Sequence, residues 1–362
     1  MRVAVLGGGN GSFAAAGDLA LAGHEVALWR RDSGAVAAHL AAGGHITVED
    51  FRGRHLARPR LITSDIAEAV RGAELIVCPT PATAQSDIAG RLAPHLAAGQ
   101  VVFLPPGTFG SVLFAKAAHA AGNRAAVAFA ETGTLPWLTR RHGPFEAAIT
   151  IRAKRLPTGV FPSRLAATAL AVLGRAFPGV IEDCGDALSA SLLNAGPIIH
   201  PPLILMNAAP LEYFERWDIH KEGTQPAVRR VTDALDGERI ATRQALGYSG
   251  PHFPLANHYA QAGEEWMYGR GSHDKLIQSG DWREKIVLTE HRYMLEDVGI
   301  GLAFLASVAR LAGIAAPLVA AFLALGSAIC GRDFLATGRS LAHLGLGDLS
   351  VHDLKALLQR GF

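Results

Sequence analysis

The chain opens with apolar positions in a strand, turn, helix, strand order. Residues 2–6 form a short apolar run rich in valine, the profile of a strand that is buried on both faces. Residues 7–12 read Gly-Gly-Gly-Asn-Gly-Ser, and apolar residues then recur with helical spacing from Phe13 until Gly23. A second strand is expected at residues 25–29. This succession predicts a βαβ unit of the kind that binds a dinucleotide; the alternative is a plain βα turn.

The residues of the glycine turn have separate predicted tasks. Gly7 permits the tight turn, and Gly9 lets a pyrophosphate approach the backbone because it has no Cβ. The amides of Gly11 and Ser12 lie at a helix N-terminus, where free N–H groups and the helix dipole favour anionic oxygens. Ser12 replaces the usual third glycine and is small enough for helix–strand packing. The predicted cofactor-binding residues are Gly7, Gly9, Asn10, Gly11, Ser12, Arg30, Arg31 and Thr80.

The tip of the second strand bears on cofactor choice. An NAD-preferring site usually has an acid here for the ribose hydroxyls, whereas this chain has Arg30 and Arg31. Two guanidiniums suit a 2′-phosphate through charge and bidentate hydrogen bonds, which favours NADP(H). In the alternative, both arginines are surface residues and Asp32 binds the ribose, which leaves NAD(H) possible.

The rest of the N-terminal half alternates strands with helices. Such alternation predicts an α/β Rossmann domain, a doubly wound and mainly parallel sheet with helices on both faces. Residues 33–59 are expected to form a helix and a short excursion, and residues 63–65 to cap a short helix. The remaining expected elements are strands at 74–78, 100–104, 125–130 and 145–152, and helices at 86–96, 110–121 and 164–177.

Three of these strands end in polar or proline-containing turns. In such sheets ligands bind outside the carboxyl ends of the strands. Thr80, Thr108, Glu131 and Thr132 are therefore expected to face the same crevice as the glycine turn. For Glu131, a solvated loop carboxylate is an equally good interpretation.

From Asp186 onward the pattern becomes helical, and βα alternation ends. We therefore predict an NAD(P)-binding domain over residues 1–185 and an all-helical substrate and catalytic domain over residues 186–362. Residues 311–330 carry no charge and have the length of a bilayer span, but Gly313, Pro317 and Gly326 interrupt them. Burial inside the domain or at a subunit interface is the favoured interpretation over a membrane helix.

Two segments of the helical half could carry chemistry. His200 lies in an apolar run with three nearby prolines, which are expected to prevent a regular helix. Such a histidine is more often a satisfied core residue than a catalyst. Asp297 could be a helix N-cap, and Arg292 with Glu296 an i,i+4 surface pair. In the functional interpretation, Asp297 orients His200 and stabilises its protonated form, so that the pair can transfer a proton.

Composition excludes several other functions. The net charge is +2 and 18% of residues are charged, so neither nucleic acid nor an acidic membrane surface is an expected partner. The three scattered cysteines form no pairing framework, which favours the cytoplasm. The histidines lack metal-ligand spacing, and no metal is expected. Because the N-terminus is a predicted strand, no cleavable signal peptide is expected.

Several motifs together resemble the opine dehydrogenase family, the octopine, nopaline and related bacterial enzymes. The motifs are GGGNGS, AET with LPW, NAGPIIHP, RYMLEDVGIGL and GRSLAHLGLGDLS, in the family's order and across essentially the whole chain. The segment with Asn194 and His200, paired with the one from Arg292 to Asp297, is specific to the family; the glycine turn is not.

The resemblance implies a reaction and roles for particular residues. Family members condense the amino group of an amino acid with an α-keto acid such as pyruvate, and NAD(P)H reduces the resulting imine; the reverse oxidation is equally implied. By motif, His200 resembles the proton donor and acceptor, Asp297 its partner, and Arg292 the carboxylate clamp. The implied substrate-binding residues are Arg292, Glu131, Thr132, Thr108 and Asn194.

The chain departs from the family pattern at four places. Ser12, Arg30-Arg31, Thr108 and Gly299 differ from the usual residues and affect cofactor choice, specificity or local backbone. The amino acid, the keto acid, the direction of reaction and the oligomeric state are left open, a homodimer being one possibility.

Two alternatives are also open. One is a simple reductase of the ketopantoate reductase or glycerol-3-phosphate dehydrogenase type, which needs a lysine near the domain junction; none of the six lysines lies in a matching motif. The other is a non-catalytic NADP(H) sensor, which has no reason to keep a histidine, an arginine and an aspartate together.

Overall fold

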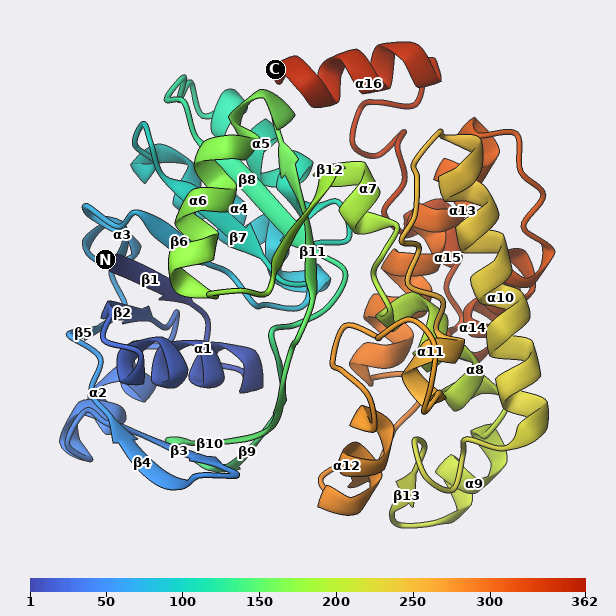
Figure 1. The fold of residues 1–362 in the computed structure, drawn as a ribbon, viewed down its shortest axis with the longest axis horizontal. Coiled ribbons are helices and arrows are strands. Elements are labelled where there is room, and N and C mark those ends of the chain that lie inside the picture. Colours follow the sequence, from blue (N-terminus) through green and yellow to red (C-terminus); the bar gives the residue numbers. More distant parts are fainter. The chain divides into compact units, whose positions relative to one another are not determined.

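The computed structural model describes all 362 residues, which form two compact units (Figure 1). The first unit contains Met1–Thr80, Ala84–Ser191 and Leu358–Phe362. The second contains Pro81–Thr83 and Leu192–Leu357. The chain therefore crosses between the units more than once, and the functional boundary after residue 185 stays a prediction.

The first unit is built on an eight-stranded sheet with the strand order β12-β11-β8-β7-β6-β1-β2-β5. Neighbouring strands are parallel except β8 and β11, which are antiparallel. A mainly parallel sheet of this order confirms the predicted Rossmann class. The strands are β1 (Arg2–Leu6), β2 (Glu25–Trp29), β5 (Leu61–Thr63), β6 (Leu75–Val77), β7 (Val101–Leu104), β8 (Ala128–Thr132), β11 (Leu156–Phe161) and β12 (Ile181–Asp186).

Helices alternate with these strands, as the apolar periodicity predicted. β1 is buried from Val3 to Leu6, and α1 buries Phe13 and the alanines that follow it. Asp65 caps α3 by accepting hydrogen bonds from the backbone N–H groups of Ala67 and Glu68. The helices are α1 (Asn10–Leu21), α2 (Ser33–Ala41), α3 (Ile66–Val70), α4 (Gln85–Leu92), α5 (Gly110–Ala120), α6 (Ala166–Ala176) and α7 (Ala187–Ser191), with 3-10 turns at Ala82–Ala84, Ala93–His95 and Ser163–Leu165.

A second sheet of four strands was not predicted. Its order is β4-β3-β10-β9, and it belongs to the first unit. The excursion expected within residues 33–59 is the hairpin of β3 and β4, and the strand expected at 145–152 joins this hairpin instead of extending the main sheet. The strands are β3 (Ile46–Asp50), β4 (Gly53–Ala57), β9 (Trp137–Gly143) and β10 (Glu146–Arg152).

The main sheet also differs from the sequence prediction at its edges. β5, β11 and β12 were not predicted, because β5 is very short, β11 contains Pro157 and Gly159, and β12 has no apolar run. The strand expected to stop at residue 130 continues to Thr132, where it pairs with Thr158. Glu131 is therefore a strand residue and not part of a turn.

The second unit is helical except for a ribbon of two short strands. Its most unusual element is a π-helix at Tyr293–Leu302, labelled η4, which continues into α13. The elements are α8 (Gly196–Leu205), α9 (Ala208–Tyr213), β13 (Trp217–Asp218), α10 (Pro226–Ala245), α11 (Ala256–Tyr259), α12 (Ser272–Ser279), β14 (Arg283–Glu284), η4, α13 (Ala303–Leu311), α14 (Pro317–Cys330), α15 (Phe334–Thr337) and α16 (Val351–Arg360), whose last residues, from Leu358, belong to the first unit.

The uncharged run at 311–330 contains a turn and the fourteen-residue helix α14, which starts at Pro317. One face of α14 is buried through Val319, Phe322 and Leu323, while Leu325 and Ile329 are exposed. Burial inside the unit is therefore observed for one face of the helix, and burial of the other face at a subunit interface stays a prediction. A different stretch, Ala187–Leu205, has the length and hydropathy of a membrane-crossing helix. However, 78% of its most apolar 18-residue segment is buried, as in a core helix.

Candidate active site

The glycine turn leads from β1 into α1 in the predicted geometry. Gly7 has a φ of +122°, a conformation that side chains rarely adopt. A Cβ on Gly7 would lie 2.6 Å from Ser12 Oγ and 2.9 Å from Thr80 Cγ2. Ser12 in turn donates a hydrogen bond to the carbonyl of Leu6 at 3.4 Å. The turn, Ser12 and Thr80 are thus packed against one another, so Thr80 does lie beside the glycine turn.

The same turn fits a pyrophosphate. Gly9 is the N-cap of α1, and a Cβ built on it would meet no atom within 4 Å. The helix starts at Asn10, so the amides of Asn10, Gly11 and Ser12 belong to the first turn, where no intrahelical acceptor is available. Open space in front of free amide donors at a helix N-terminus is the arrangement that dinucleotide phosphates require.

The two arginines at the tip of β2 are in different situations. Arg30 is partly buried and donates a hydrogen bond to the carbonyl of Ala35 at 3.0 Å. Arg31 is exposed and forms an ion pair with Asp87 at 3.2 Å. Asp32, the alternative ribose ligand, caps α2 by accepting a hydrogen bond from the amide of Ala35. Arg30 is therefore the arginine of this pair that has no carboxylate partner.

Glu131 is fully buried, which neither of its two sequence interpretations anticipated. Its carboxylate accepts hydrogen bonds from the amide of Phe109 at 2.9 Å and from the hydroxyl of Ser111. Any side chain on Gly107 would collide with this carboxylate. Thr108 and Phe109 both have positive φ, so the carboxylate holds a strained loop at the N-terminus of α5.

The other predicted substrate-binding residues of this kind are also buried. Thr108 is 4% exposed and Thr132 is 0% exposed, with its hydroxyl donating to the carbonyl of Thr134. Asn194 is 6% exposed and accepts a hydrogen bond from the amide of Gly196 at 3.0 Å, just before α8. Their contact with a substrate stays a prediction.

His200 and Asp297 form the contact that the functional interpretation required. His200 lies on α8 and Asp297 on the π-helix η4, and His200 Nδ1 is 2.7 Å from Asp297 Oδ2. Burial raises the pKa of Asp297 to about 7, although the positive charge of Arg292 opposes the rise. Asp297 is within η4 and is not its N-cap. A buried carboxylate with this pKa, bonded to an imidazole, forms a pair that exchanges a proton in the neutral range.

Tyr293 is a site residue that the sequence interpretation missed. Its ring is buried and stacks on the His200 imidazole, with the ring centroids 3.8 Å apart. Tyr293 and Asp297 lie four residues apart on η4, so one element both stacks on His200 and hydrogen-bonds to it. An aromatic residue four positions before Asp297 was a signal that the sequence offered for a second contact with His200.

The prolines around His200 do not prevent a helix. Pro197 lies in the first turn of α8, where its missing N–H costs nothing, and Pro201 and Pro202 lie inside the helix. The helix is also tightly packed against η4: a side chain on Gly196 would collide with Asp297, and one on Gly301 would collide with Pro197. The expectation of an irregular segment is wrong.

Arg292 and Glu296 form the predicted i,i+4 pair, with Arg292 Nη1 3.6 Å from Glu296 Oε2, but it is not a simple surface pair. The arginine side chain is 52% exposed, whereas that of Glu296 is 12% exposed. Glu296 accepts a hydrogen bond from the amide of Ala82 at 2.8 Å, and burial raises its pKa to about 7. Glu296 therefore anchors residues 81–83, while the Arg292 side chain is half exposed and its guanidinium carbon lies 5.1 Å from the centroid of the Tyr293 ring.

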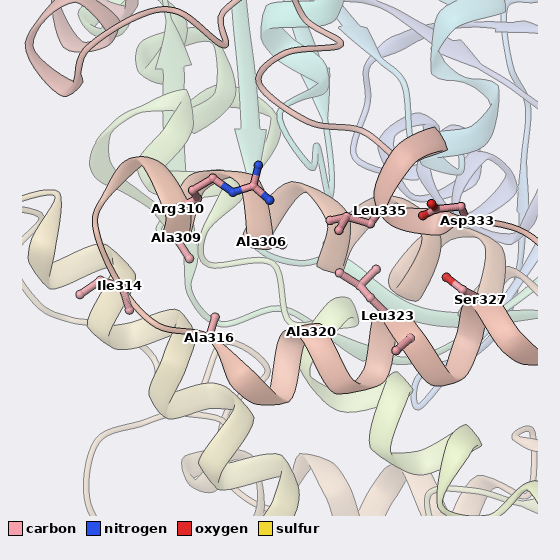
Figure 2. Close-up of a pocket in the computed structure, with 11 residues that line it drawn as sticks. Ala306, Ala309, Arg310, Ile314, Ala316, Ala320, Leu323, Ser327, Asp333 and Leu335 are labelled. Carbon is pink, nitrogen blue, oxygen red and sulfur yellow. The ribbon is translucent and has the colours of Figure 1, made fainter.

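An apolar groove of about 500 Å³ on the second unit lies apart from these residues. Figure 2 shows it along α13, α14 and α15, with Ala309, Leu323 and Leu335 among its lining residues. None of the predicted site residues lines it. No group of three or more histidine, cysteine or acidic side chains is arranged to hold a metal ion.

A doubly wound sheet with a glycine turn, followed by a helical unit with a histidine–aspartate pair, defines a two-domain NAD(P)-dependent dehydrogenase. Residues 183–330 match the family model described as the α-helical domain of NAD/NADP octopine/nopaline dehydrogenase. Residues 2–105 match the N-terminus of NAD-dependent glycerol-3-phosphate dehydrogenase. The chain belongs to the opine dehydrogenase family and is an NAD(P)-dependent oxidoreductase.

Individual relatives match along the whole chain. The opine dehydrogenase of Arthrobacter sp. (strain 1C) is 29% identical over 361 residues, covering 98% of both chains. A solved octopine dehydrogenase with NADH and pyruvate has a TM-score of 0.74 at 19% identity and covers 98% of both chains. A solved yersinopine dehydrogenase with NADP⁺ has a TM-score of 0.69 at 16% identity and covers 99% of this chain and 98% of its own.

The buried position of Glu131 leads to a first prediction. Glu131→Gln keeps the size of the side chain but removes the charge on which Phe109 N–H and Ser111 Oγ–H converge. We expect the free energy of unfolding to fall by about 1.5–3 kcal/mol, the usual cost of losing hydrogen bonds to a buried charge. Thermal and denaturant unfolding would measure this change. Glu182→Gln, at a part-exposed ion pair with Arg155, is the control and should cost less than about 1 kcal/mol. An unchanged stability together with a raised KM for an amino acid would contradict the structural role.

Proposed function

We propose that this protein reductively condenses the amino group of an amino acid with an α-keto acid such as pyruvate. The observation that carries the proposal is the His200–Asp297 pair, stacked on Tyr293 within the octopine/nopaline dehydrogenase domain. The name of the Arthrobacter relative, and the pyruvate in the octopine dehydrogenase structure, support the same reaction class.

The proposed reaction balances as follows. The amine attacks the keto carbon, water leaves, and an imine forms. Bound NAD(P)H supplies the hydride that reduces the imine carbon. One keto acid, one amino acid, NAD(P)H and a proton thus give one secondary amine dicarboxylate, NAD(P)⁺ and water.

In this proposal the dyad moves the protons. Asp297 holds His200 through Nδ1, which fixes the imidazole to exchange its proton through Nε2. The protonated pair donates a proton to the carbonyl oxygen that leaves as water, and in the oxidative direction the deprotonated pair accepts one. Tyr293 keeps the imidazole plane fixed by stacking.

Arg292 is the proposed clamp for the keto-acid carboxylate. Its guanidinium is half exposed, and its neighbour Glu296 is 3.6 Å away, too far for a short bidentate pair. A planar guanidinium can bind a carboxylate through two parallel hydrogen bonds.

NADP(H) is the proposed cofactor, because Arg30 lies without a carboxylate partner at the strand tip where the ribose 2′ position is read. The solved relatives include complexes with NADH and with NADP⁺, so NAD(H) is the alternative.

The surroundings of the enzyme are also proposals. Cys78 and Cys330 are free thiols, which supports a reducing cytoplasm. The exposed apolar side chains of Leu325 and Ile329 on α14 and of Leu335 on α15 support a homodimer formed through these helices.

The function is tested by following NADPH and NADH absorbance with pyruvate and a panel of amino acids. We expect oxidation that requires both the keto acid and the amino acid, with a secondary amine product identified by mass spectrometry. Each component alone is the control. Oxidation with the keto acid alone would assign the protein to the simple reductases, and tight cofactor binding without oxidation would favour a sensor.

The dyad makes a second kinetic prediction. Asp297→Asn keeps the side-chain shape but removes the charge that stabilises protonated His200, so kcat should fall about 10²- to 10⁴-fold. His200→Ala should do the same. The dissociation constant of NADPH, measured by fluorescence, should change little, because the glycine turn belongs to the first unit.

The pH profile separates this role from a structural one. Since the raised pKa of Asp297 is about 7, the pair loses its proton as the pH rises through neutrality. The reductive kcat/KM should therefore fall, and the oxidative kcat/KM should rise, over the same pH range. Parallel profiles in the two directions, or full activity of Asp297→Asn, would remove the dyad from the mechanism.

Arg292→Lys should raise the KM for the keto acid about tenfold and change kcat less, because a point charge cannot reproduce the planar fork. Arg310→Lys, at an exposed arginine near the end of α13, is the matched control. An unaltered KM in the Arg292 variant would make this residue structural.

A further inference from the structure

Arg141 approaches the glycine turn from the second sheet. It lies on β9, and its Nη1 donates a hydrogen bond to the carbonyl of Gly8 at 3.2 Å. Its Nε and Nη2 donate to the carbonyls of Gly143 and Pro144 at 3.3 and 2.6 Å. The guanidinium is therefore held in place, and its carbon lies 4.5 Å from the centroid of the Phe13 ring.

Arg30 reaches the same two residues from the other direction. Its guanidinium carbon is 5.4 Å from the Phe13 centroid, and a Cβ on Gly8 would lie 3.1 Å from its Nε. Both arginines thus contact Gly8 and Phe13. Phe13 is itself fixed, because it stacks on the buried ring of His39, which stacks on Phe145.

Neither of these two arginines forms an ion pair, although the charge of Asp32 acts on Arg30. All their hydrogen bonds go to backbone carbonyls, and neither forms an ion pair with a carboxylate. Burial lowers the pKa of both guanidiniums, and the charge of Arg30 lowers that of Arg141 further. Two fixed, partly buried cations that form no ion pair are suited to a dianion.

Arg31, the second arginine that the sequence suggested, is in a different situation. Its side chain is 70% exposed and its charge is already paired with Asp87, which also pairs with Arg91. It contacts neither Gly8 nor Phe13 in the structure.

We infer that Arg30 and Arg141 together bind the 2′-phosphate of NADP(H), and that Arg141 is a cofactor-specificity residue supplied by the second sheet. The inference rests on the proposed use of NADP(H). A 2′-phosphate is a dianion at neutral pH, and the tip of β2 is where the adenosine ribose lies in this class of fold. The cation–π contacts with Phe13 keep the two like charges oriented toward this place before the cofactor binds.

The test measures binding directly and needs no turnover. The dissociation constants of NADPH and NADH, and of the fragments 2′,5′-ADP and 5′-AMP, are measured by calorimetry for the intact protein and for Arg141→Gln, Arg30→Gln and Arg31→Gln. Arg141→Gln and Arg30→Gln should weaken NADPH and 2′,5′-ADP about 10- to 100-fold, the range for lost charge-assisted hydrogen bonds. Their NADH and 5′-AMP affinities should change less than about threefold. Arg31→Gln, the matched control, should change neither cofactor.

Several outcomes would overturn the inference. Equal weakening of NADPH and NADH by Arg141→Gln would mean that Arg141 only supports the Gly8 backbone. A wild-type protein that binds NADH as tightly as NADPH would also overturn it, as would an Arg31 variant with the larger effect. Arg141→Lys keeps the charge and checks folding, because it should retain part of the NADPH preference if the variant protein is intact. Opine formation measured separately with either cofactor distinguishes failure of this inference from failure of the proposed function.

Discussion

The hydrogen bond between His200 and Asp297 depends on an unusually close approach of two helices. Asp297 can reach His200 only because Gly196, one turn before His200 on α8, leaves room for its carboxylate. Gly301 leaves the same room for Pro197 one turn further along η4. The wide turns of a π-helix then place Tyr293 and Asp297 together on one imidazole. The two glycines, Pro197 and the π-helix η4 therefore act together to hold the imidazole of His200 in place.

Glu131 shows that a carboxylate near the end of a parallel strand can hold the loop beside it, and its contact with a substrate stays a prediction. Side chains at the end of a strand such as β8 often bind a ligand in this class of sheet. The carboxylate oxygens of Glu131 accept hydrogen bonds from the amide of Phe109 and the hydroxyl of Ser111. A buried carboxylate at a helix N-terminus can hold Thr108 and Phe109 in their strained conformations, because its charge is stabilised by donors that converge on it. In this structure Glu131 on β8 therefore fixes the conformation of the loop that contains Thr108 and Phe109.

The sequence predicted the elements that are encoded by residues close together along the chain. The β1-α1-β2 unit was predicted to within a residue or two, because its strand, glycine turn and helix are encoded by adjacent residues. The four-stranded sheet was not, since β3 and β10 pair across nearly a hundred residues. β12 was not predicted, because it is an edge strand with acidic residues and no apolar run. The roles of His200 and Asp297 came from resemblance, because nothing in their spacing along the chain brings α8 and η4 together. Arg141 carried no local signal at all, since only the second sheet brings it to the glycine turn.

Buried charges have nearby partners of opposite charge in the His200–Asp297 site, whereas Arg30 and Arg141 near the glycine turn form no ion pair. This difference agrees with the functions proposed for the two sites. In the second unit, burial raises the pKa of Asp297 and Glu296 while arginine or histidine partners lie beside them, so protons can be exchanged without leaving an isolated charge. In the first unit, Arg30 and Arg141 form no ion pair and repel each other. An unpaired cation pair destabilises the free protein, and a dianion that binds only the folded state removes that cost and stabilises the fold by mass action. A site that must release and bind its cofactor in every cycle benefits from charges that the protein itself leaves uncompensated, because any internal carboxylate would compete with the phosphate for the same donors.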